Sequence, residues 1–461
     1  MSPSTIVAIA TPTGRSGIGV IRLSGGDSLG ITRRLISDNE FLPRPRTAHL
    51  KQLHDPATGD VIDEAIITYF QAPHSFTGED VVEISCHGSP VLLRQVVDIC
   101  LSLDARMAEA GEFTLRALGN GRINLAEAEA IRDLIEAQTT ASARQAVRQL
   151  RGEFSNQLQP IKDDLLDVIV ILESALEFVE DDLPAAQFAD VRKRMVDVSE
   201  AVGKIASTFT AGRLIREGLR VALVGRPNVG KSSLFNALLG SERAIVTEIA
   251  GTTRDQIHER FVVENIPVSL IDTAGLRDTT DTVESIGVER SKATMADADL
   301  VIVMLDASDE ITPEDHEILE SVKELNYIVA VNKIDKQPSQ DIDRLIAGAH
   351  SSLAYLRPKV TPLSAKTGDG LDDLRHAIIR PFSPEDITTS GFLVTDARHH
   401  DLLVRAKDEI EQSILQLNEK MSEEIILIGL HNALRYLGQI TGETTTEDML
   451  SRIFSTFCIG K

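Results

Sequence analysis

Three features are scarce in this 461-residue sequence: cysteine, long apolar runs and basic residues. The three cysteines (Cys86, Cys100 and Cys458) are too few for a disulfide framework and fit a reducing compartment. No segment approaches the roughly 18 uncharged apolar residues of a membrane span, and the first residues lack the basic start of a signal peptide. We therefore expect a cytoplasmic protein without a membrane span.

Basic residues are outnumbered by acidic ones. The sequence contains 47 Lys and Arg against 70 Asp and Glu, which gives a formal net charge of −23. Proteins that scan DNA or RNA unaided neutralise phosphates with basic residues, so a mainly negative surface disfavours that class. If RNA is a substrate, we expect a local basic patch or a basic partner to hold it.

The length suggests about three domains at roughly 150 residues each. Residues 1–118 alternate short β-rich runs with Gly, Pro and Ser turns, which predicts an α+β domain. Its expected strands are 4–11, 19–24, 63–70 and 80–85. Residues 119–217 are rich in Ala, Glu, Gln, Leu and Arg with helical spacing of the apolar positions, so we expect long packed helices over 125–149 and 158–180.

Residues 218–382 alternate continuous β-branched runs with helical stretches. Such runs are typical of parallel strands covered on both faces, and the alternation predicts a doubly wound α/β domain. The expected strands are 221–225, 268–272, 300–306 and 327–333. Residues 383–461 return to helical composition, so the fold class is a multidomain α+β and α/β protein in which the α/β domain interrupts one helical domain.

A phosphate-binding loop follows the first of these α/β strands. Residues 225–232 read G-R-P-N-V-G-K-S, which matches G-x-x-x-x-G-K-[ST] between a strand and a helix expected over 233–239. Glycines let backbone N–H groups turn toward phosphate oxygens, the lysine reaches the β- and γ-phosphates, and the serine hydroxyl can ligate Mg²⁺. The loop residues expected to contact nucleotide are Asn228, Val229, Gly230, Lys231, Ser232 and Ser233.

Further motifs follow in order along the same domain. Asp272-Thr273-Ala274-Gly275 closes a buried strand where a carboxylate can hold Mg²⁺ through water, and Thr253 is a candidate second Mg²⁺ ligand in a preceding switch. Asn332-Lys333-Ile334-Asp335 closes another strand. The Asp335 carboxylate can accept hydrogen bonds from guanine N1 and N2, which adenine cannot offer. Ser364-Ala365-Lys366 follows a later strand, so the set predicts a GTP-binding, Ras-like G domain.

Two departures from the Ras pattern bear on mechanism. Leu276 occupies the position of the water-orienting glutamine, so that role passes to another residue, with Asp278, Asp281 and Glu284 as the nearest acidic candidates. Asn228 lies inside the phosphate loop, where its amide oxygen can ligate a monovalent cation beside the phosphates.

More specific segments accompany these motifs: TPTGRSGIGVIRLSG, SFTGEDVVEISCHGSP, GEFTLRALGNGRINLAEAEAI and the closing FCIGK. With them, the chain resembles the MnmE (also called TrmE) family of tRNA modification GTPases over essentially its full length. The resemblance implies a homodimer formed through an N-terminal domain that binds 5-formyl-tetrahydrofolate or a related folate. It also implies a flavoprotein partner, MnmG (GidA), in a heterotetramer or larger complex that brings tRNA.

Matching the family pattern residue by residue implies several site residues. The folate residues are Arg22, Glu83, Arg122 and Lys461, with Arg122 standing where many members carry lysine. The implied K⁺ ligands are Asn228, Thr247, Ile249 and Thr252, and Glu284 matches the family's water-orienting glutamate. The implied activity is K⁺-dependent GTP hydrolysis serving formation of 5-carboxymethylaminomethyl or aminomethyl groups on the wobble uridine of certain tRNAs.

Two alternatives stay open. Cys458 lies beside the implied folate residues and can take part in the chemistry, or it is a small apolar filler where the FCIGK segment docks. The chain as a whole can instead be a regulatory or ribosome-assembly GTPase switch. That class typically carries a second G domain or a basic RNA-binding domain, whereas this sequence has one phosphate loop and a charge of −23.

Overall fold

The computed structural model describes residues 4–177, 185–241, 259–271, 298–336, 359–382, 391–443, 450, 453–457 and 460. The chain divides into two compact units. One consists of Met1–Arg132, Gln149–Gln159 and Leu434–Lys461, and the other of Asp133–Arg148 and Pro160–Ala433. The domain boundaries expected from the sequence stay a prediction.

The N-terminal part contains a mixed six-stranded sheet in the order β3-β4-β5-β2-β1-β6. Four strands overlap the expected ones, whereas β3 and the short β6 were not expected. The bounds are β1 Ile6–Ile9, β2 Ser16–Ser24, β3 Ala48–His54, β4 Val61–Phe70, β5 Val81–Gly88 and β6 Arg106–Met107.

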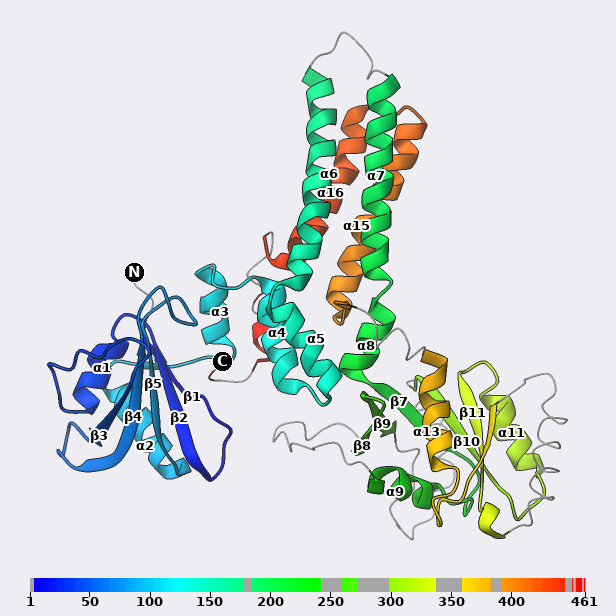
Figure 1. Cartoon of the computed structure of the whole chain (residues 1–461), viewed down its shortest axis with the longest axis horizontal. Helices are drawn as coiled ribbons and strands as arrows, with labels where there is room; N and C mark the ends of the chain where they lie inside the picture. The colour runs from blue at the N-terminus through cyan, green and yellow to red at the C-terminus, as the bar shows by residue number, and fades with distance from the viewer. Residues whose placement is uncertain are drawn as a thin grey trace. The chain divides into compact units, whose positions relative to one another are not determined.

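Strand alternation gives this sheet two faces. The larger apolar core lies on one face, and the other carries a smaller apolar cluster around Phe113 beside polar residues of β2 and β5. Ile21 and Leu23 of β2 share an apolar cluster with residues of helices α1 Ser28–Leu35 and α2 Pro90–Ser102. Figure 1 shows both helices beside the sheet. Arg22 lies between Ile21 and Leu23 in the strand and therefore points to the opposite face. Helix α3 Glu112–Gly119 supplies Phe113 beside Arg22, so a polar site is built on that face.

Helices follow from residue 125 onward. The expected single helix over 125–149 is wrong: it is two helices, because the Thr139 hydroxyl accepts a hydrogen bond from the Ser142 N–H at 3.1 Å and caps a new helix. The helix expected over 158–180 begins earlier, so Pro160 lies inside it. The bounds are α4 Leu125–Glu136, α5 Thr140–Leu150, α6 Glu153–Glu177, α7 Ala185–Ala206, α8 Phe209–Glu217, α15 Ala397–Asn418 and α16 Glu423–Thr441.

The α/β part has a second six-stranded sheet, in the order β12-β11-β10-β7-β9-β8. All of its pairs are parallel except β8 with β9, and apolar clusters cover both faces, as a doubly wound domain requires. The strand β8 was not expected from the sequence. The strands are β7 Leu219–Val224, β8 Glu259–Val263, β9 Ile266–Ile271, β10 Leu300–Asp306, β11 Tyr327–Asn332 and β12 Lys359–Pro362.

Short helices connect these strands. Helix α9 Lys231–Ser241 follows β7 and replaces the shorter helix expected over 233–239, and α11 Pro313–Ser321 follows β10. Helix α13 Leu371–Ile379 follows β12, and single 3₁₀ turns lie at Ile334–Lys336 and Arg380–Phe382. Within the described ranges, none of the helices has the length and apolarity needed to cross a membrane.

The segments on either side of the α/β part meet again beside α8. The Val394 N–H donates to the Thr208 hydroxyl at 3.0 Å, and Arg216 of α8 forms ion pairs with Asp133 at 2.8 Å and Asp396 at 2.7 Å. Burial alone would raise the pKa of Asp396, but His399 and Arg216 hold it below its usual range. This buried charge cluster fixes the points where the chain leaves and re-enters the helical part.

Candidate functional site

The phosphate loop joins β7 to α9 through residues with left-handed backbone. Asn228 has a φ of 63° and Gly230 a φ of 99°. A Cβ on Gly230 would lie 2.3 Å from Nδ2 of Asn332, so no larger residue fits there. The sequence pattern of this loop thus reflects a close approach between the loop and the end of β11.

The Lys231 side chain contacts the backbone of the phosphate loop. Its Nζ donates to the carbonyl of Gly225 at 2.7 Å and to the carbonyl of Arg226 at 2.8 Å. Burial lowers the pKa of the ammonium, and Glu314 opposes that shift. A cation at the start of α9 adds to the positive end of the helix dipole, which suits binding of anionic phosphates.

Asn332 connects two of the predicted motifs. Its Nδ2 donates to the carbonyl of Val229 at 2.8 Å, and its Oδ1 accepts from the N–H of Ala365 at 3.0 Å. The side chain is only 2% exposed, so both hydrogen bonds are shielded from water. Lys333 adds a bond from Nζ to the carbonyl of Asn228 at 2.7 Å.

Asp335 and Ser364 face each other at the expected base-recognition site. The Ser364 hydroxyl donates to Oδ1 of Asp335 at 2.7 Å and accepts from the N–H of Thr367 at 3.2 Å. Ser364 is fully buried, whereas Asp335 and Lys366 are exposed. The structure therefore brings the phosphate loop, the strand end 332–335 and the loop 364–366 together at the carboxyl edge of the sheet.

The roles of the remaining nucleotide and metal candidates stay predictions. Ser232 and Ser233 are exposed in the first turn of α9. The candidates outside the described ranges are Thr247, Ile249, Thr252, Thr253, Asp272, Thr273, Ala274, Gly275, Asp278, Asp281 and Glu284.

The N-terminal sheet brings Arg22 and Glu83 together. They are directly paired between β2 and β5, and Nε and Nη2 of Arg22 donate to Oε1 of Glu83 at 3.0 and 2.7 Å. The guanidinium lies 5.8 Å from the centre of the Phe113 ring, and its Nη1 donates to the carbonyl of Gly460 at 3.3 Å. The ion pair is therefore only partly exposed and lies beside an aromatic ring.

The closing segment of the sequence reaches Arg22 through Gly460 and packs on helix α4. Phe454 and Phe457 form a buried cluster with Leu125 and Ala128 of α4. Gly460 is buried with a φ of 100°, and a Cβ there would lie 2.5 Å from the carbonyl of Ile9. Cys458 and Lys461 lie outside the described residues, so their predicted roles are untested.

The third folate candidate, Arg122, comes from the segment that follows α3. It is exposed after α3, and its side chain lies beside Gly78. Within residues 4–177, no hydrogen bond or ion pair joins it to Arg22 or Glu83. Its predicted folate contact stays a prediction.

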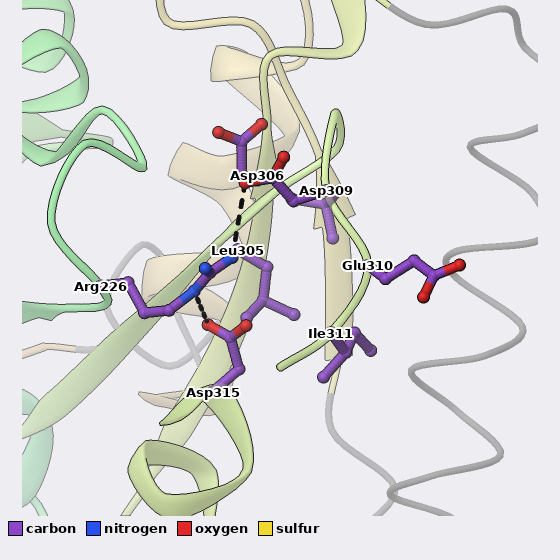
Figure 2. A pocket seen from close by; sticks show the side chains of 8 residues that line it. Arg226, Leu305, Asp306, Asp309, Glu310, Ile311 and Asp315 are labelled. Atoms are coloured by element: carbon purple, nitrogen blue, oxygen red, sulfur yellow. Dashed lines mark hydrogen bonds and ion pairs between the residues drawn. The ribbon is translucent and has the colours of Figure 1, made fainter. Parts of the chain in front are cut away.

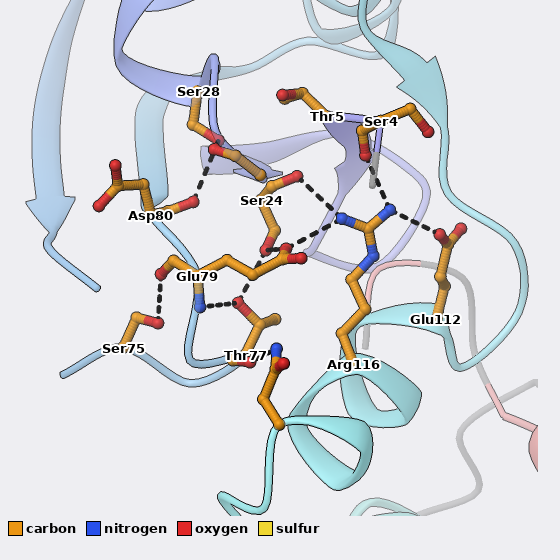
Figure 3. Close-up of polar contacts among 12 residues, drawn as sticks. Ser4, Thr5, Ser24, Ser28, Ser75, Thr77, Glu79, Asp80, Glu112 and Arg116 are labelled. Carbon is orange, nitrogen blue, oxygen red and sulfur yellow. Dashed lines mark hydrogen bonds and ion pairs between the residues drawn. The ribbon is translucent and has the colours of Figure 1, made fainter. Parts of the chain in front are cut away.

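A partly buried ionic network that sequence reasoning missed holds α3 to the sheet (Figure 3). Arg116 forms ion pairs with Glu79 and Glu112, both at 2.9 Å, and the Ser24 hydroxyl donates to Glu79 at 2.7 Å. Burial would raise the pKa of Glu112, but Arg106 and Arg116 lower it overall. Because Phe113 precedes Arg116 by less than one turn, this network fixes the ring beneath Arg22.

Known proteins resemble the whole chain. The family model described as GTP-binding protein TrmE N-terminus matches residues 5–122, and the one described as MnmE helical domain matches residues 125–458. A curated tRNA modification GTPase MnmE from Koribacter versatilis is 45% identical, with 99% of each chain covered. The protein of the same name from Aquifex aeolicus is 43% identical, again over 99% of each chain.

A solved structure was also found for part of the chain. A crystal structure of Era from Aquifex aeolicus bound to GDP and AlF4⁻ is 29% identical and covers 41% of this chain and 66% of its own, with a TM-score of 0.30.

Proposed function

The chain belongs to the MnmE (TrmE) family of tRNA modification GTPases, and on that premise we propose that it hydrolyses GTP in a K⁺-dependent reaction serving wobble uridine modification. The modification is the 5-carboxymethylaminomethyl or aminomethyl group, and its one-carbon unit comes from a folate. The flavoprotein MnmG (GidA) is the proposed partner in this chemistry.

The main support for the nucleotide site is the pair of hydrogen bonds made by Asn332. One side chain links the phosphate loop at Val229 to the loop at Ala365, so phosphate-binding and base-binding segments share one rigid edge. In the proposal, Lys231 contacts the β- and γ-phosphates and Asp335 accepts from guanine N1 and N2. These contacts orient the triphosphate relative to the attacking water.

The chain's own oxygen ligands suit the two proposed cations. Hydroxyls are ligands that Mg²⁺ accepts, and an amide oxygen within a phosphate loop suits an alkali cation. The proposed Mg²⁺ ligands are Ser232 and Thr253, and the proposed K⁺ ligands are Asn228, Thr247, Ile249 and Thr252. When bound, the cations supply positive charge beside the phosphate oxygens. Glu284 is proposed to orient the water, since Leu276 cannot.

The Arg22 and Glu83 pair supports a folate site. A carboxylate can accept from the N–H groups of a pterin ring, and the guanidinium, held above Phe113, can contact a carboxylate or stack on a flat ring. Arg122 and Lys461 are proposed to contact the same ligand. Cys458, two residues before Gly460, is proposed as a reactive thiol near the one-carbon unit.

The proposed assembly is a homodimer that joins MnmG in a heterotetramer or larger complex. The net charge of −23 favours this arrangement, because tRNA binding then relies on the partner or on a local basic patch. In this proposal, GTP-driven closure of paired G domains is coupled to the folate site.

Two measurements test the proposed function. GTP turnover in KCl should exceed turnover in NaCl by at least tenfold, and a rate indifferent to K⁺ would remove the cation role of Asn228. Mass analysis of tRNA from cells lacking the protein should show wobble uridines without the modification. Unchanged wobble uridines would instead favour a regulatory or ribosome-assembly switch.

A further inference from the structure

Arg226 occupies the second position of the phosphate loop, and its backbone and side chain have different partners. The backbone carbonyl accepts from Nζ of Lys231 at 2.8 Å. The side chain leaves the loop and reaches the start of α11, where Nε donates to Oδ1 of Asp315 at 2.9 Å. Figure 2 shows this contact across a small pocket lined by residues of β10, of the segment that follows it and of α11.

Contacts with Thr312 hold the Asp315 carboxylate in place independently of Arg226. It is the third residue of α11, and its Oδ2 accepts from both the N–H and the hydroxyl of Thr312, at 2.9 and 2.8 Å. Its own N–H donates back to the Thr312 hydroxyl, which completes a capping box. The cap therefore uses one carboxylate oxygen, and the other oxygen is directed at Arg226.

The ion pair is largely removed from water. The side chain of Asp315 is 2% exposed and that of Arg226 is 18% exposed, and Asp309 adds a second carboxylate 3.7 Å from Nη2. A shielded, hydrogen-bonded ion pair has a stronger orienting effect than a surface pair, and removal of one partner leaves a buried charge uncompensated.

A second support for the loop comes from the ends of strands β10 and β11. Asp306, at the end of β10, forms an ion pair with Lys333, and Lys333 donates to the carbonyl of Asn228 at 2.7 Å. The loop is thus held on both sides of Pro227, at Arg226 and at Asn228. At the second support Asn228 has a left-handed backbone conformation, which asparagine adopts more readily than most non-glycine residues.

We propose that Arg226 and Asp315 are a positioning pair for GTP binding, which fixes the backbone of the phosphate loop from the first turn of α11. Neither side chain contacts substrate in this proposal. The pair acts through the main chain of residues 226–228 and through the carbonyl that orients Lys231. The inference rests on the proposed assignment of residues 225–232 to phosphate binding.

The test measures release of fluorescent N-methylanthraniloyl-GDP and steady-state GTP hydrolysis by the full-length chain. Arg226→Ala should speed GDP release and raise KM about tenfold, while kcat changes less than about twofold, because the loop binds phosphates in the ground state and transition state alike. Arg226→Lys should recover at least half of the lost affinity, because an ammonium still pairs with Asp315.

If Arg226→Ala does not fold, Asp315→Asn tests loss of the same ion pair from the other partner. The amide oxygen keeps the Thr312 cap, but the NH₂ group then faces the guanidinium and cannot accept from it. The double variant should be no weaker than the worse single variant, since both remove one interaction. The matched control is Lys323→Ala, which removes an exposed pair with Glu320 at the far end of α11 and should leave release unchanged.

Wild-type release rates in both Arg226→Ala and Asp315→Asn would overturn the proposal. Additive losses of nucleotide affinity in the double variant would overturn it as well, because additivity means that the two side chains act independently. Lys231→Ala, measured alongside, tests the phosphate-loop assignment itself. If that variant binds nucleotide normally, the assignment fails, whereas weakened binding there with normal Arg226→Ala refutes only the positioning role.

Discussion

Asn332 and Val229 are joined by a hydrogen bond of 2.8 Å from the side-chain amide to the backbone carbonyl, at a point that is almost fully buried. The same side chain accepts from the N–H of Ala365. The strand end that is expected to read the base is therefore a structural part of the phosphate loop, and changes at either site should affect the other.

Asn332→Ala should destabilise the α/β part and accelerate nucleotide release. The change leaves a carbonyl at Val229 and an N–H at Ala365 without partners in a buried setting, at a cost of about 1–3 kcal/mol each. Thermal unfolding with and without GDP measures the loss. Asn326→Ala removes an exposed amide as the control. An unfolding temperature and release rate equal to wild type would contradict the bridging role.

Asp335→Asn should reduce the preference for GTP over ATP by at least tenfold. An amide offers one acceptor and a donor group, so it cannot accept both guanine N–H groups as a carboxylate does. Competition binding with the two nucleotides measures the ratio, and Asp373→Asn on the exposed side of α13 is the control. A preserved preference would exclude Asp335 from base recognition.

Arg22→Ala should abolish folate binding as measured by calorimetry with 5-formyl-tetrahydrofolate. The change also leaves Glu83 without its guanidinium partner, and the unpaired carboxylate can repel the anionic folate. Arg22→Lys keeps the positive charge, so it separates this repulsion from loss of the planar guanidinium geometry. Arg15→Ala, an exposed arginine in the same domain, is the control. Normal heat of binding in Arg22→Ala would relocate the site.

Gly460→Ala should weaken folate binding at least tenfold while changing the unfolding temperature little. The added Cβ would lie 2.5 Å from the Ile9 carbonyl and the backbone is left-handed, so the closing segment cannot keep its contact with Arg22. Calorimetry and thermal unfolding of the same sample separate the two effects. Unaltered affinity would show that the folate pocket does not need this segment.

Cys86 and Cys100 should resist thiol reagents in the folded protein near pH 8. Burial raises the pKa of Cys86 to about 11 and that of Cys100 to about 12. Since only the thiolate reacts, about one Cys86 side chain in a thousand is reactive at pH 8, and labelling should rise as the pH approaches the raised pKa. Peptide-resolved labelling gives the rates, and fast reaction of either thiol would disprove this protection. The same experiment shows whether Cys458 is the reactive thiol that the proposed chemistry requires.

The strongest sequence predictions came from patterns with a single structural interpretation. The run of β-branched and apolar residues at 300–306 was expected as a strand and is β10 with the same bounds. The strand β3 was missed because AHLKQLH contains no Val, Ile, Thr, Tyr, Phe or Trp, and Leu53 is its one buried residue at the sheet edge. The break between α4 and α5 was missed because Thr139 acts as a cap only through a local hydrogen bond.

Contacts between distant positions could not be predicted from the sequence. The motif 332–335 was identified, but nothing in it shows that Asn332 also supports Val229 and Ala365. Arg226 matched a variable position of the phosphate-loop pattern, and its partner Asp315 lies three strands later in the chain. The contact of Gly460 with Ile9 likewise depends on packing of Phe454 and Phe457 that no local pattern encodes.

The hydrogen bond between Thr208 and Val394 has a consequence for engineering of this protein. Because the chain leaves toward the α/β part after Thr208 and returns at Val394 within hydrogen-bonding distance, most of the segment between them can be excised. A short linker can then join its two flanks. Arg216 would have to be retained in the shortened protein, because it is the ion-pair partner of Asp133 in the remaining helices. By the same reasoning, an α/β domain with neighbouring ends can be inserted into another helical domain without changes to the rest of that domain.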